Sequence, residues 1–472
     1  MKPLPLSRIA QYCKGRLEGA DALIDAIETD TRTLDASDGR AALFVALKGE
    51  RFDGHAHVSA AAELGARAAL VARIVDTSIP QVLVADTERA LADLASAVQH
   101  GRDGKVIAIT GSNGKTTVKT LLVAILSRMG KAYANPGNRN NEIGLPMAVI
   151  DAPDDADFAI YEMGAGKPGD IAYLTAIARP DVSLVNNIAP AHLERMGSLQ
   201  GVADTKAAIY DALPVDGTAV VNADDAFADA FVARIARLPS RRVIRFGIDA
   251  GIDAGGNDFD VCASNLRFGD EGMYFTLALG SRFGDSDAEV MLPLTGRHNV
   301  GNALAAAALA LACGAGLDDI VAGLRDAEPV SGRLVRHRLA NGAVLIDDSY
   351  NANPGSLDAA IDTLASMSGE SWLVLGDMRE LGPQARELHA AAGLRARHAG
   401  ITRLFTLGAM SEAAAEAFGE GARTFTTHAA LAEALRNELH TSVRVLVKGS
   451  RGSAMDRIVD ALMPTGEAEH AA

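Results

Sequence analysis

Cysteine is scarce in this chain of 472 residues. Cys13, Cys262 and Cys313 are far apart, and their spacing matches neither a disulfide framework nor a metal site. We therefore expect three reduced thiols, which is typical of proteins in a reducing compartment. The scarcity of cysteine thus predicts a cytoplasmic protein.

The sequence also lacks long apolar segments and an excess of positive charge. No apolar run approaches the length of a membrane span, and residues 1–6 have no signal-type apolar core. The net charge of -15 argues against a nucleic acid or an anionic membrane as main partner, because either would favour a basic face. We therefore expect no nucleic-acid partner and no membrane insertion. An anionic substrate stays compatible with this charge, since a local basic pocket does not show in it.

Length and strand–helix alternation predict an α/β protein of three domains, because the chain is too long for one core. Residues 1–103 form a small N-terminal α/β domain that ends in a polar break at 99–104. Residues 104–327 alternate strand and helix, which predicts a mostly parallel sheet flanked by helices, with an antiparallel part at 259–294. Residues 328–472 form a smaller Rossmann-like C-terminal domain.

The strongest motif is a strand, a glycine-rich turn and a helix start within residues 105–117. The turn and helix start comprise Thr110, Gly111, Ser112, Asn113, Gly114, Lys115, Thr116 and Thr117. Glycines let backbone N–H groups face phosphate oxygens, and the helix dipole favours anions. Lys115 would reach the terminal phosphates and Thr116 would bind magnesium. This motif predicts nucleotide binding, although Ile109 stands where the usual P-loop has a glycine.

Two further strands predict polar side chains at the same edge of the sheet. Glu162 ends the strand at 158–163, and His192 follows the strand at 182–186. Ligands of open α/β sheets bind outside the carboxyl ends of the strands. We therefore expect Glu162 to hold magnesium and His192 to contact metal or substrate.

Four segments further along supply candidate residues for binding nucleotide or substrate. Asn299 and Asn302 share one face of a helix start, and their amides could pair with an adenine edge. Arg333, beyond the second domain boundary, could reach the terminal phosphate when the domains close. The strand at 343–346 ends in a polar cluster of Asp348, Tyr350, Asn351 and Asn353. Lys448 and Arg451 flank a Gly-Ser turn, and such a turn between two cations could bind a substrate carboxylate.

Together these motifs resemble the Mur ligases, the ATP-dependent amide-bond-forming enzymes of peptidoglycan precursor synthesis, over nearly the whole chain. Residues 110–117 resemble the family's ATP loop, including its missing early glycine. Residues 135–146 and 347–354 resemble the member that adds a dipeptide, and the Asp-Asn-Pro-Arg run associated with diaminopimelate addition is absent. The resemblance implies ATP and Mg²⁺ as cofactors, UDP-N-acetylmuramoyl-tripeptide and D-alanyl-D-alanine as substrates, and we expect a monomer.

The resemblance also implies roles for individual residues. Lys206 aligns with a family lysine that is carbamylated to an anionic magnesium ligand, although its neighbours read Lys-Ala-Ala-Ile instead of Lys-Gly-Glu-Ile. Lys115, His192, Lys206 and Arg333 are the expected catalytic residues, and Asp348 and Arg333 would contact ribose and phosphate. The expected substrate contacts are Thr31, Arg32, Lys48, Asn138, Asn141, Glu142, Tyr350, Asn351, Asn353 and Arg451.

Two other functions stay open. A sister ligase, either another Mur enzyme or folylpolyglutamate synthase, would add a single amino acid, but the latter lacks a first domain of this kind. A nucleotide-dependent switch or regulator would use the same loop without amide chemistry. A GTPase switch would be expected to carry Asn-Lys-x-Asp, which is absent here.

Overall fold

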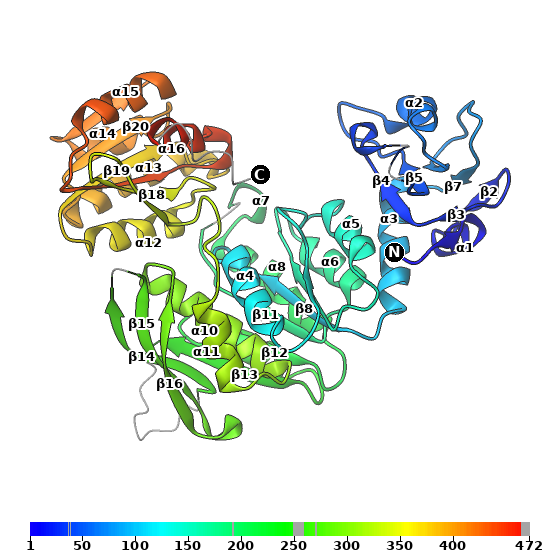
Figure 1. The fold of residues 1–472 in the computed structure, drawn as a ribbon, viewed down its shortest axis with the longest axis horizontal. Coiled ribbons are helices and arrows are strands. Elements are labelled where there is room, and N and C mark those ends of the chain that lie inside the picture. Colours follow the sequence, from blue (N-terminus) through cyan, green and yellow to red (C-terminus); the bar gives the residue numbers. More distant parts are fainter. Residues whose placement is uncertain (36, 38, 191–192, 249–258, 270, 464–472) are drawn as a thin grey trace.

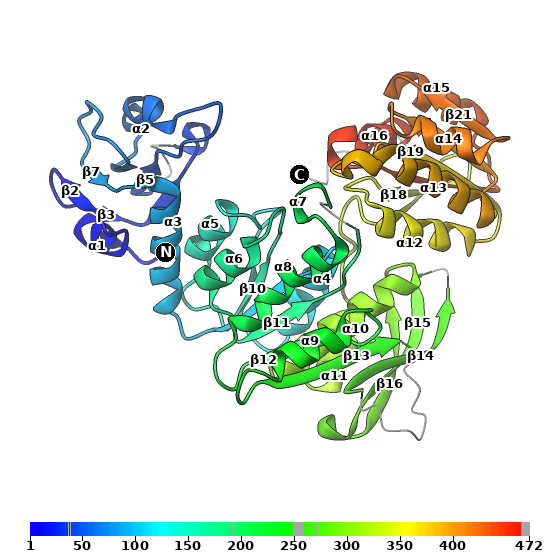
Figure 2. The ribbon, with the colours of Figure 1, turned by 180° about the vertical axis from the view of Figure 1, so that it is seen from behind.

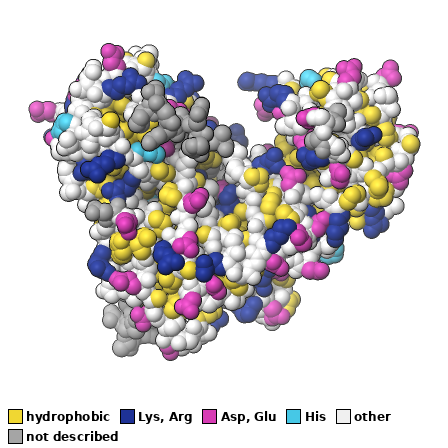
Figure 3. Space-filling model, in the orientation of Figure 1, with side chains coloured by type: hydrophobic (Ala, Val, Ile, Leu, Met, Phe, Trp, Pro, Cys, Tyr) yellow, Lys and Arg dark blue, Asp and Glu magenta, His cyan; other side chains and the backbone are white. Residues whose placement is uncertain are grey.

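The computed structural model describes residues 1–35, 37, 39–190, 193–248, 259–269 and 271–463. Three sheets flanked by helices follow one another along the chain, which confirms the predicted α/β class. Figure 1 shows the first and third sheets on opposite sides of the central one, and Figure 2 shows the same arrangement from behind. In Figure 3 a hollow separates the two outer units. Within the described part of the chain, no helix is long and apolar enough to cross a membrane.

The N-terminal sheet has the order β2-β7-β6-β5-β4. Its strands are β2 (Arg16–Glu18), β4 (Ala26–Glu28), β5 (Ala42–Val45), β6 (Ala68–Val71) and β7 (Gln81–Leu83), and β1 (Leu4–Pro5) pairs with β3 (Leu23–Ile24) beside it. The helices are α1 (Leu6–Tyr12), α2 (Val58–Glu63) and α3 (Thr87–His100). Helix α3 also packs against the central unit, where buried Gln99 accepts a 3.0 Å hydrogen bond from the Tyr161 hydroxyl. The start of the predicted polar break is therefore packed.

The central sheet has nine strands in the order β16-β15-β14-β13-β12-β11-β8-β10-β9. They are β8 (Lys105–Thr110), β9 (Ala132–Ala134), β10 (Phe158–Glu162), β11 (Val182–Val185), β12 (Thr218–Asn222), β13 (Arg242–Ile248), β14 (Val261–Phe268), β15 (Met273–Leu279) and β16 (Ser286–Leu292). Strands β8 to β14 pair in parallel, and β15 and β16 are antiparallel. The predicted antiparallel part therefore exists and continues the same sheet.

Helices cover both faces of this sheet, as a parallel sheet requires. One face packs on α4 (Lys115–Leu126), α10 (Arg297–Ala312) and α11 (Leu317–Arg325). The other packs on α6 (Asp170–Ala178), α8 (Leu199–Asp211) and α9 (Ala228–Ile235), with α5 (Gly144–Asp151) and α7 (Leu193–Met196) nearby. The apolar run 106–109 of β8 is fully enclosed between them. The carboxyl ends of β8, β10 and β11 therefore open at one edge.

The third sheet has the order β17-β18-β22-β19-β20-β21. Its strands are β17 (Val335–Arg338), β18 (Val344–Asp348), β19 (Glu370–Gly376), β20 (Arg403–Leu407), β21 (Ala422–Phe425) and β22 (Val443–Lys448). All pair in parallel except β17. Helices α12 (Pro354–Ala365), α13 (Ala385–His398) and α14 (Glu412–Phe418) pack on one face, and α15 (His428–Glu438) and α16 (Asp456–Leu462) on the other.

Tyr210 on α8 joins two strands of the central sheet. Its buried hydroxyl accepts a hydrogen bond from the Val185 N–H at 3.1 Å and donates one to the Val220 carbonyl at 2.8 Å. The Tyr210→Phe variant leaves both backbone groups without this partner, so we expect it to lose about 1–3 kcal/mol of unfolding free energy. Urea unfolding measures the loss, with half-buried Tyr12→Phe as control. A Tyr210→Phe variant as stable as the control would contradict this account.

Candidate active site

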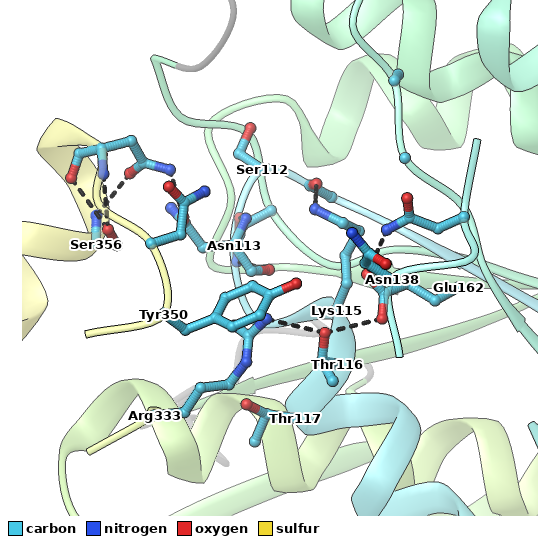
Figure 4. A pocket seen from close by; sticks show the side chains of 18 of the residues that line it. Ser112, Asn113, Lys115, Thr116, Thr117, Asn138, Glu162, Arg333, Tyr350 and Ser356 are labelled. Atoms are coloured by element: carbon cyan, nitrogen blue, oxygen red, sulfur yellow. Dashed lines mark hydrogen bonds between the residues drawn. The ribbon is translucent and has the colours of Figure 1, made fainter. Parts of the chain in front are cut away.

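A cavity of about 700 Å³ lies where the central and third units meet. The phosphate loop, the end of β10, the segment before β17 and the segment after β18 line it (Figure 4). Most of the predicted site residues reach this cavity. They are Gly111, Ser112, Asn113, Gly114, Lys115, Thr116, Thr117, Asn138, Asn141, Glu142, Glu162, Lys206, Asn299, Asn302, Arg333, Asp348, Tyr350, Asn351 and Asn353.

The phosphate loop has backbone conformations that require glycine. Gly114 at the N-cap of α4 has a φ of 78°. A Cβ there would lie 2.3 Å from the Asn302 side-chain oxygen, so no larger residue fits. Lys115 donates from Nζ to the Gly111 carbonyl at 2.9 Å. Removal of this ammonium from bulk water lowers its pKa, and Glu162 partly opposes that effect.

Glu162 is buried at the end of β10 and surrounded by donors. Its carboxylate accepts from Thr116 Oγ1 at 2.8 Å and from Asn140 Nδ2 at 2.9 Å. Burial alone would raise the pKa of Glu162, but the ammonium groups of Lys115 and Lys119 and these hydrogen bonds outweigh it and lower the pKa. The carboxylate is therefore held ionised beside the phosphate loop.

Arg333 brings the third unit to the phosphate loop. Its Nη2 donates to Thr116 Oγ1 at 3.0 Å, so Thr116 lies between Arg333 and Glu162, as Figure 4 shows. The guanidinium lies 4.4 Å from the ring centre of Tyr350, and its buried Nε has no hydrogen-bond partner among the described residues. A second contact joins Asn353 Nδ2 to Asn113 Oδ1 at 2.7 Å. The geometry leaves Arg333 with donor capacity beside a phosphate cradle.

Asp348 forms a buried ion pair with Lys448, 2.6 Å from Nζ to Oδ2. Burial raises the pKa of Asp348, and Lys448 opposes this shift. Lys448 also donates to the Asn351 carbonyl at 2.9 Å and lines the cavity. The pair therefore fixes the polar segment that follows β18.

We expect Lys448→Met to lower the unfolding free energy by about 3 kcal/mol at pH 7, because it leaves a buried carboxylate unpaired. The pKa of Asp348 in the folded variant rises further above its unfolded value. As pH falls, Asp348 of the folded variant becomes protonated and neutral, so it no longer needs a partner. The loss of unfolding free energy relative to the wild type therefore shrinks towards acidic pH. Urea unfolding at several pH values measures it, and Lys14→Met, which removes an exposed pair with Asp93, is the control. A deficit independent of pH would contradict this assignment.

Lys206 is 3% exposed on α8. Burial, assisted by the charge of Lys115, lowers the pKa of Lys206 well below its ordinary value. The structure places it at the cavity, which an exposed helical lysine would not reach. His192 lies outside the described residues.

Five of the predicted residues that the structure describes do not line the cavity. Thr110 is buried at the end of β8, where its hydroxyl donates to the Met163 carbonyl at 2.9 Å. Thr31 and Arg32 lie in a short 3-10 turn of the N-terminal unit, where Arg32 pairs with Asp30, and Lys48 follows β5 in the same unit. The Arg451 guanidinium lies 5.9 Å from the Tyr350 ring centre, but its side chain is largely exposed and pairs with Asp456.

Asn299 and Asn302 are buried one turn apart within α10, whose N-cap is Gly296. Helix capping therefore does not explain Asn299. Its side chain donates to the Thr295 carbonyl at 2.7 Å, and Asn302 accepts from Asn186 Nδ2 at 2.9 Å. These bonds tie α10 to the end of β11 next to the phosphate loop.

The sequence analysis missed several polar residues at this site, among them Lys119, Asn140 and Asn187. Lys119 and Asn140 contact Glu162, and Asn187 Oδ1 accepts from the Asn113 N–H at 2.8 Å. Lys119 lies four residues after Lys115, on the same helix face, and this spacing is the signal that could have identified it.

A strand, glycine loop and helix at the carboxyl edge of a parallel sheet, with an arginine from another unit, define a multi-domain protein of the nucleotide-binding P-loop class. Family models for the Mur ligase middle domain and for the Mur ligase, glutamate ligase domain match residues 109–310 and 332–451. The chain belongs to the Mur ligase family.

Characterised relatives match almost end to end. The UDP-N-acetylmuramoyl-tripeptide–D-alanyl-D-alanine ligase of Escherichia coli K12 is 42% identical over 99% of this chain and 100% of its own length. The enzyme of the same name from Bacillus subtilis is 32% identical over 97% and 98%. A crystal structure of MurF from Acinetobacter baumannii has a TM-score of 0.89 at 33% identity, covering 98% of this chain and 99% of that one.

A Thermotoga maritima MurF structure in complex with ADP has a TM-score of 0.81 at 26% identity, over 93% and 96% of the two chains. A Mycobacterium tuberculosis folylpolyglutamate synthase structure, at 20% identity and a TM-score of 0.62 over 80% and 95%, shares the fold.

Proposed function

We propose that this chain is an ATP-dependent ligase that joins D-alanyl-D-alanine to UDP-N-acetylmuramoyl-tripeptide in the cytoplasm and acts as a monomer. The 42% identity to the E. coli ligase over the full length supports the substrates. The observation that carries the chemistry is the convergence of Lys115, Glu162 and Arg333 on Thr116 and its loop. A single-amino-acid ligase is the second candidate, and relatives of full length disfavour it.

The reaction needs ATP because a carboxylate is a poor electrophile. A carboxylate oxygen of the tripeptide attacks the γ-phosphorus, the bond to ADP breaks, and an acyl-phosphate forms. The amino group of D-alanyl-D-alanine then attacks the acyl carbon, loses a proton, and the tetrahedral intermediate expels inorganic phosphate. The protein mainly orients these groups and stabilises charge on the transferring phosphoryl group.

The residues at the cavity fit these tasks. Lys115 and the N-terminus of α4 would hold the phosphates, and Arg333 would stabilise the γ-phosphoryl charge. Asn299 and Asn302 would lie near adenine and Asp348 near the ribose.

Magnesium would neutralise phosphate charge and polarise the phosphoryl group. Among the described residues no group of three or more His, Cys, Asp and Glu side chains could hold a metal ion. Thr116 and Glu162 nevertheless fit, because Mg²⁺ is bound by one or two protein oxygens together with phosphate oxygens and water. Lys206, as a carbamate, and His192 would be further metal ligands and catalytic residues. The neutral amine favoured by burial of Lys206 is the form that adds carbon dioxide.

We assign the substrates to the three predicted domains. Residues 1–103 would bind the UDP-sugar through Thr31, Arg32 and Lys48. Residues 104–327 would bind ATP, with Asn138, Asn141 and Glu142 contacting the tripeptide. Residues 328–472 would bind the dipeptide through Tyr350, Asn351, Asn353 and Arg451. Closure of the cavity would exclude water from the acyl-phosphate.

The test is phosphate release from ATP and Mg²⁺, with UDP-N-acetylmuramoyl-tripeptide and D-alanyl-D-alanine added singly and together. We expect release only with both, together with a UDP-pentapeptide product. Release that ignores the dipeptide but requires a single amino acid would identify a sister ligase instead. No release with any pair would contradict the proposal.

A further inference from the structure

Lys119 is a buried lysine that the chemistry above does not use. It lies on α4 one turn after Lys115, and its side chain is 8% exposed. Its Nζ donates to the backbone carbonyls of Asn135 at 2.8 Å and Gly137 at 3.3 Å, and lies 3.4 Å from Glu162 Oε2. Burial of an ammonium costs several kcal/mol unless it is paired and hydrogen-bonded. These three oxygens provide that compensation.

The loop that Lys119 holds, residues 135–144, is bound to Glu162 at several other points. Asn135 Oδ1 accepts from the Glu162 N–H at 2.8 Å, and Asn135 Nδ2 donates to the Glu162 carbonyl at 3.1 Å. Asn140 Nδ2 donates to the Glu162 carboxylate, and the Gly164 N–H donates to the Asn140 carbonyl at 2.8 Å. The loop and the end of β10 therefore form one hydrogen-bonded unit with Lys119 beneath it.

The same loop turns Asn138, Asn141 and Glu142 towards the cavity that Glu162 also faces. A shift of the loop would move these side chains together with the Glu162 carboxylate. Lys119 holds the loop and pairs with Glu162 through one ammonium group. It lies on α4, the helix that begins with Lys115. It thus links three parts of the site: the phosphate helix, the loop and the carboxylate.

We propose that Lys119 is a positioning residue that fixes the 135–144 loop and the Glu162 carboxylate relative to the phosphate helix. It thereby aligns the acceptor carboxyl group with the metal ion and the γ-phosphate. This inference rests on the proposed function, in which Glu162 holds the metal and the loop contacts the tripeptide. In this account Lys115 contacts the phosphates directly. Lys119 contacts neither phosphate nor substrate and acts only by holding the loop and the Glu162 carboxylate in place.

The test compares the full-length wild type with Lys119→Met and Lys119→Arg. Lys131→Met, which removes an exposed lysine beside β9, is the matched control. Binding of Mn²⁺ in the presence of ADP, followed by electron paramagnetic resonance, needs no turnover. Steady-state assays give KM for each substrate, and thermal unfolding checks the fold of each variant.

We expect Lys119→Met to weaken Mn²⁺ binding and to raise KM for UDP-N-acetylmuramoyl-tripeptide, each by about 10-fold or more. KM for D-alanyl-D-alanine should change less than about twofold, since that substrate binds on the third unit. Lys119→Arg, which keeps the charge and donors, should show smaller changes in Mn²⁺ affinity and tripeptide KM than Lys119→Met. If Lys119→Met does not fold, Lys119→Arg compared with the wild type carries the test.

A folded Lys119→Met with Mn²⁺ affinity and tripeptide KM like those of Lys131→Met would overturn the proposal. An equal rise in KM for all substrates without rescue by arginine would also overturn it, because that pattern describes general loss of structure. Failure of the wild type itself to bind Mn²⁺ with ADP, or to couple the two substrates, would instead count against the proposed function.

Discussion

Replacement of Lys115 by methionine is expected to lower kcat/KM for UDP-pentapeptide formation by about 10³-fold. The side chain enters the cavity from the first turn of α4 and now donates to the Gly111 carbonyl. Bound phosphate would offer it a charged acceptor instead, and methionine cannot replace that interaction. Phosphate release and product formation measured together give the loss.

Lys105→Met is the matched control for Lys115→Met. Lys105 begins β8 at the opposite end from the phosphate loop, so its removal should leave kcat/KM within about twofold of the wild type. A Lys115→Met variant that retains more than about a tenth of the wild-type kcat/KM would contradict the role given to this ammonium.

Replacement of Arg333 is expected to have the second large effect. Arg333→Met should lower kcat by about 10³-fold while ADP affinity changes much less, because the guanidinium is expected to act on the transferring phosphoryl group. Arg333→Lys keeps a charge but loses the planar fork and the stacking on Tyr350, so we expect it to remain impaired by about 10²-fold or more.

Single-turnover kinetics and ADP titration separate the two effects of Arg333. Arg336→Met, three residues further on and over the Phe268 ring, removes an arginine from the same segment and serves as control. Loss of ADP affinity in step with kcat would assign Arg333 to nucleotide binding alone.

Much of the site could be predicted because its information is local. The strand, glycine turn and helix at 105–117 are set by adjacent residues, and α4 begins at Lys115 as the pattern indicates. Glu162 could be predicted because parallel strands end at one edge, and β10 pairs directly with β8. The α/β class follows in the same way from strand–helix alternation.

Other features depend on contacts that no short pattern contains. A lysine in a helix is exposed by default, so the burial of Lys119 and Lys206 appears only when the loop at 135–144 and helix α8 pack around the site. The edge strand β17 has the sequence Val-Arg-His-Arg, which contains one apolar residue and so no alternating apolar pattern, and it was not predicted. The contact between Arg333 and Thr116 joins residues 217 positions apart, and only the packing of the third unit creates it.

The central claim is that ATP activates the tripeptide carboxylate as an acyl-phosphate before amide formation. UDP-N-acetylmuramoyl-tripeptide labelled with ¹⁸O at both oxygens of its terminal carboxylate tests this claim directly. Mass spectrometry of the inorganic phosphate released with D-alanyl-D-alanine should detect one ¹⁸O atom per phosphate, because the bridging carboxylate oxygen leaves with phosphorus. Phosphate without ¹⁸O, alongside normal formation of UDP-pentapeptide, would contradict the account.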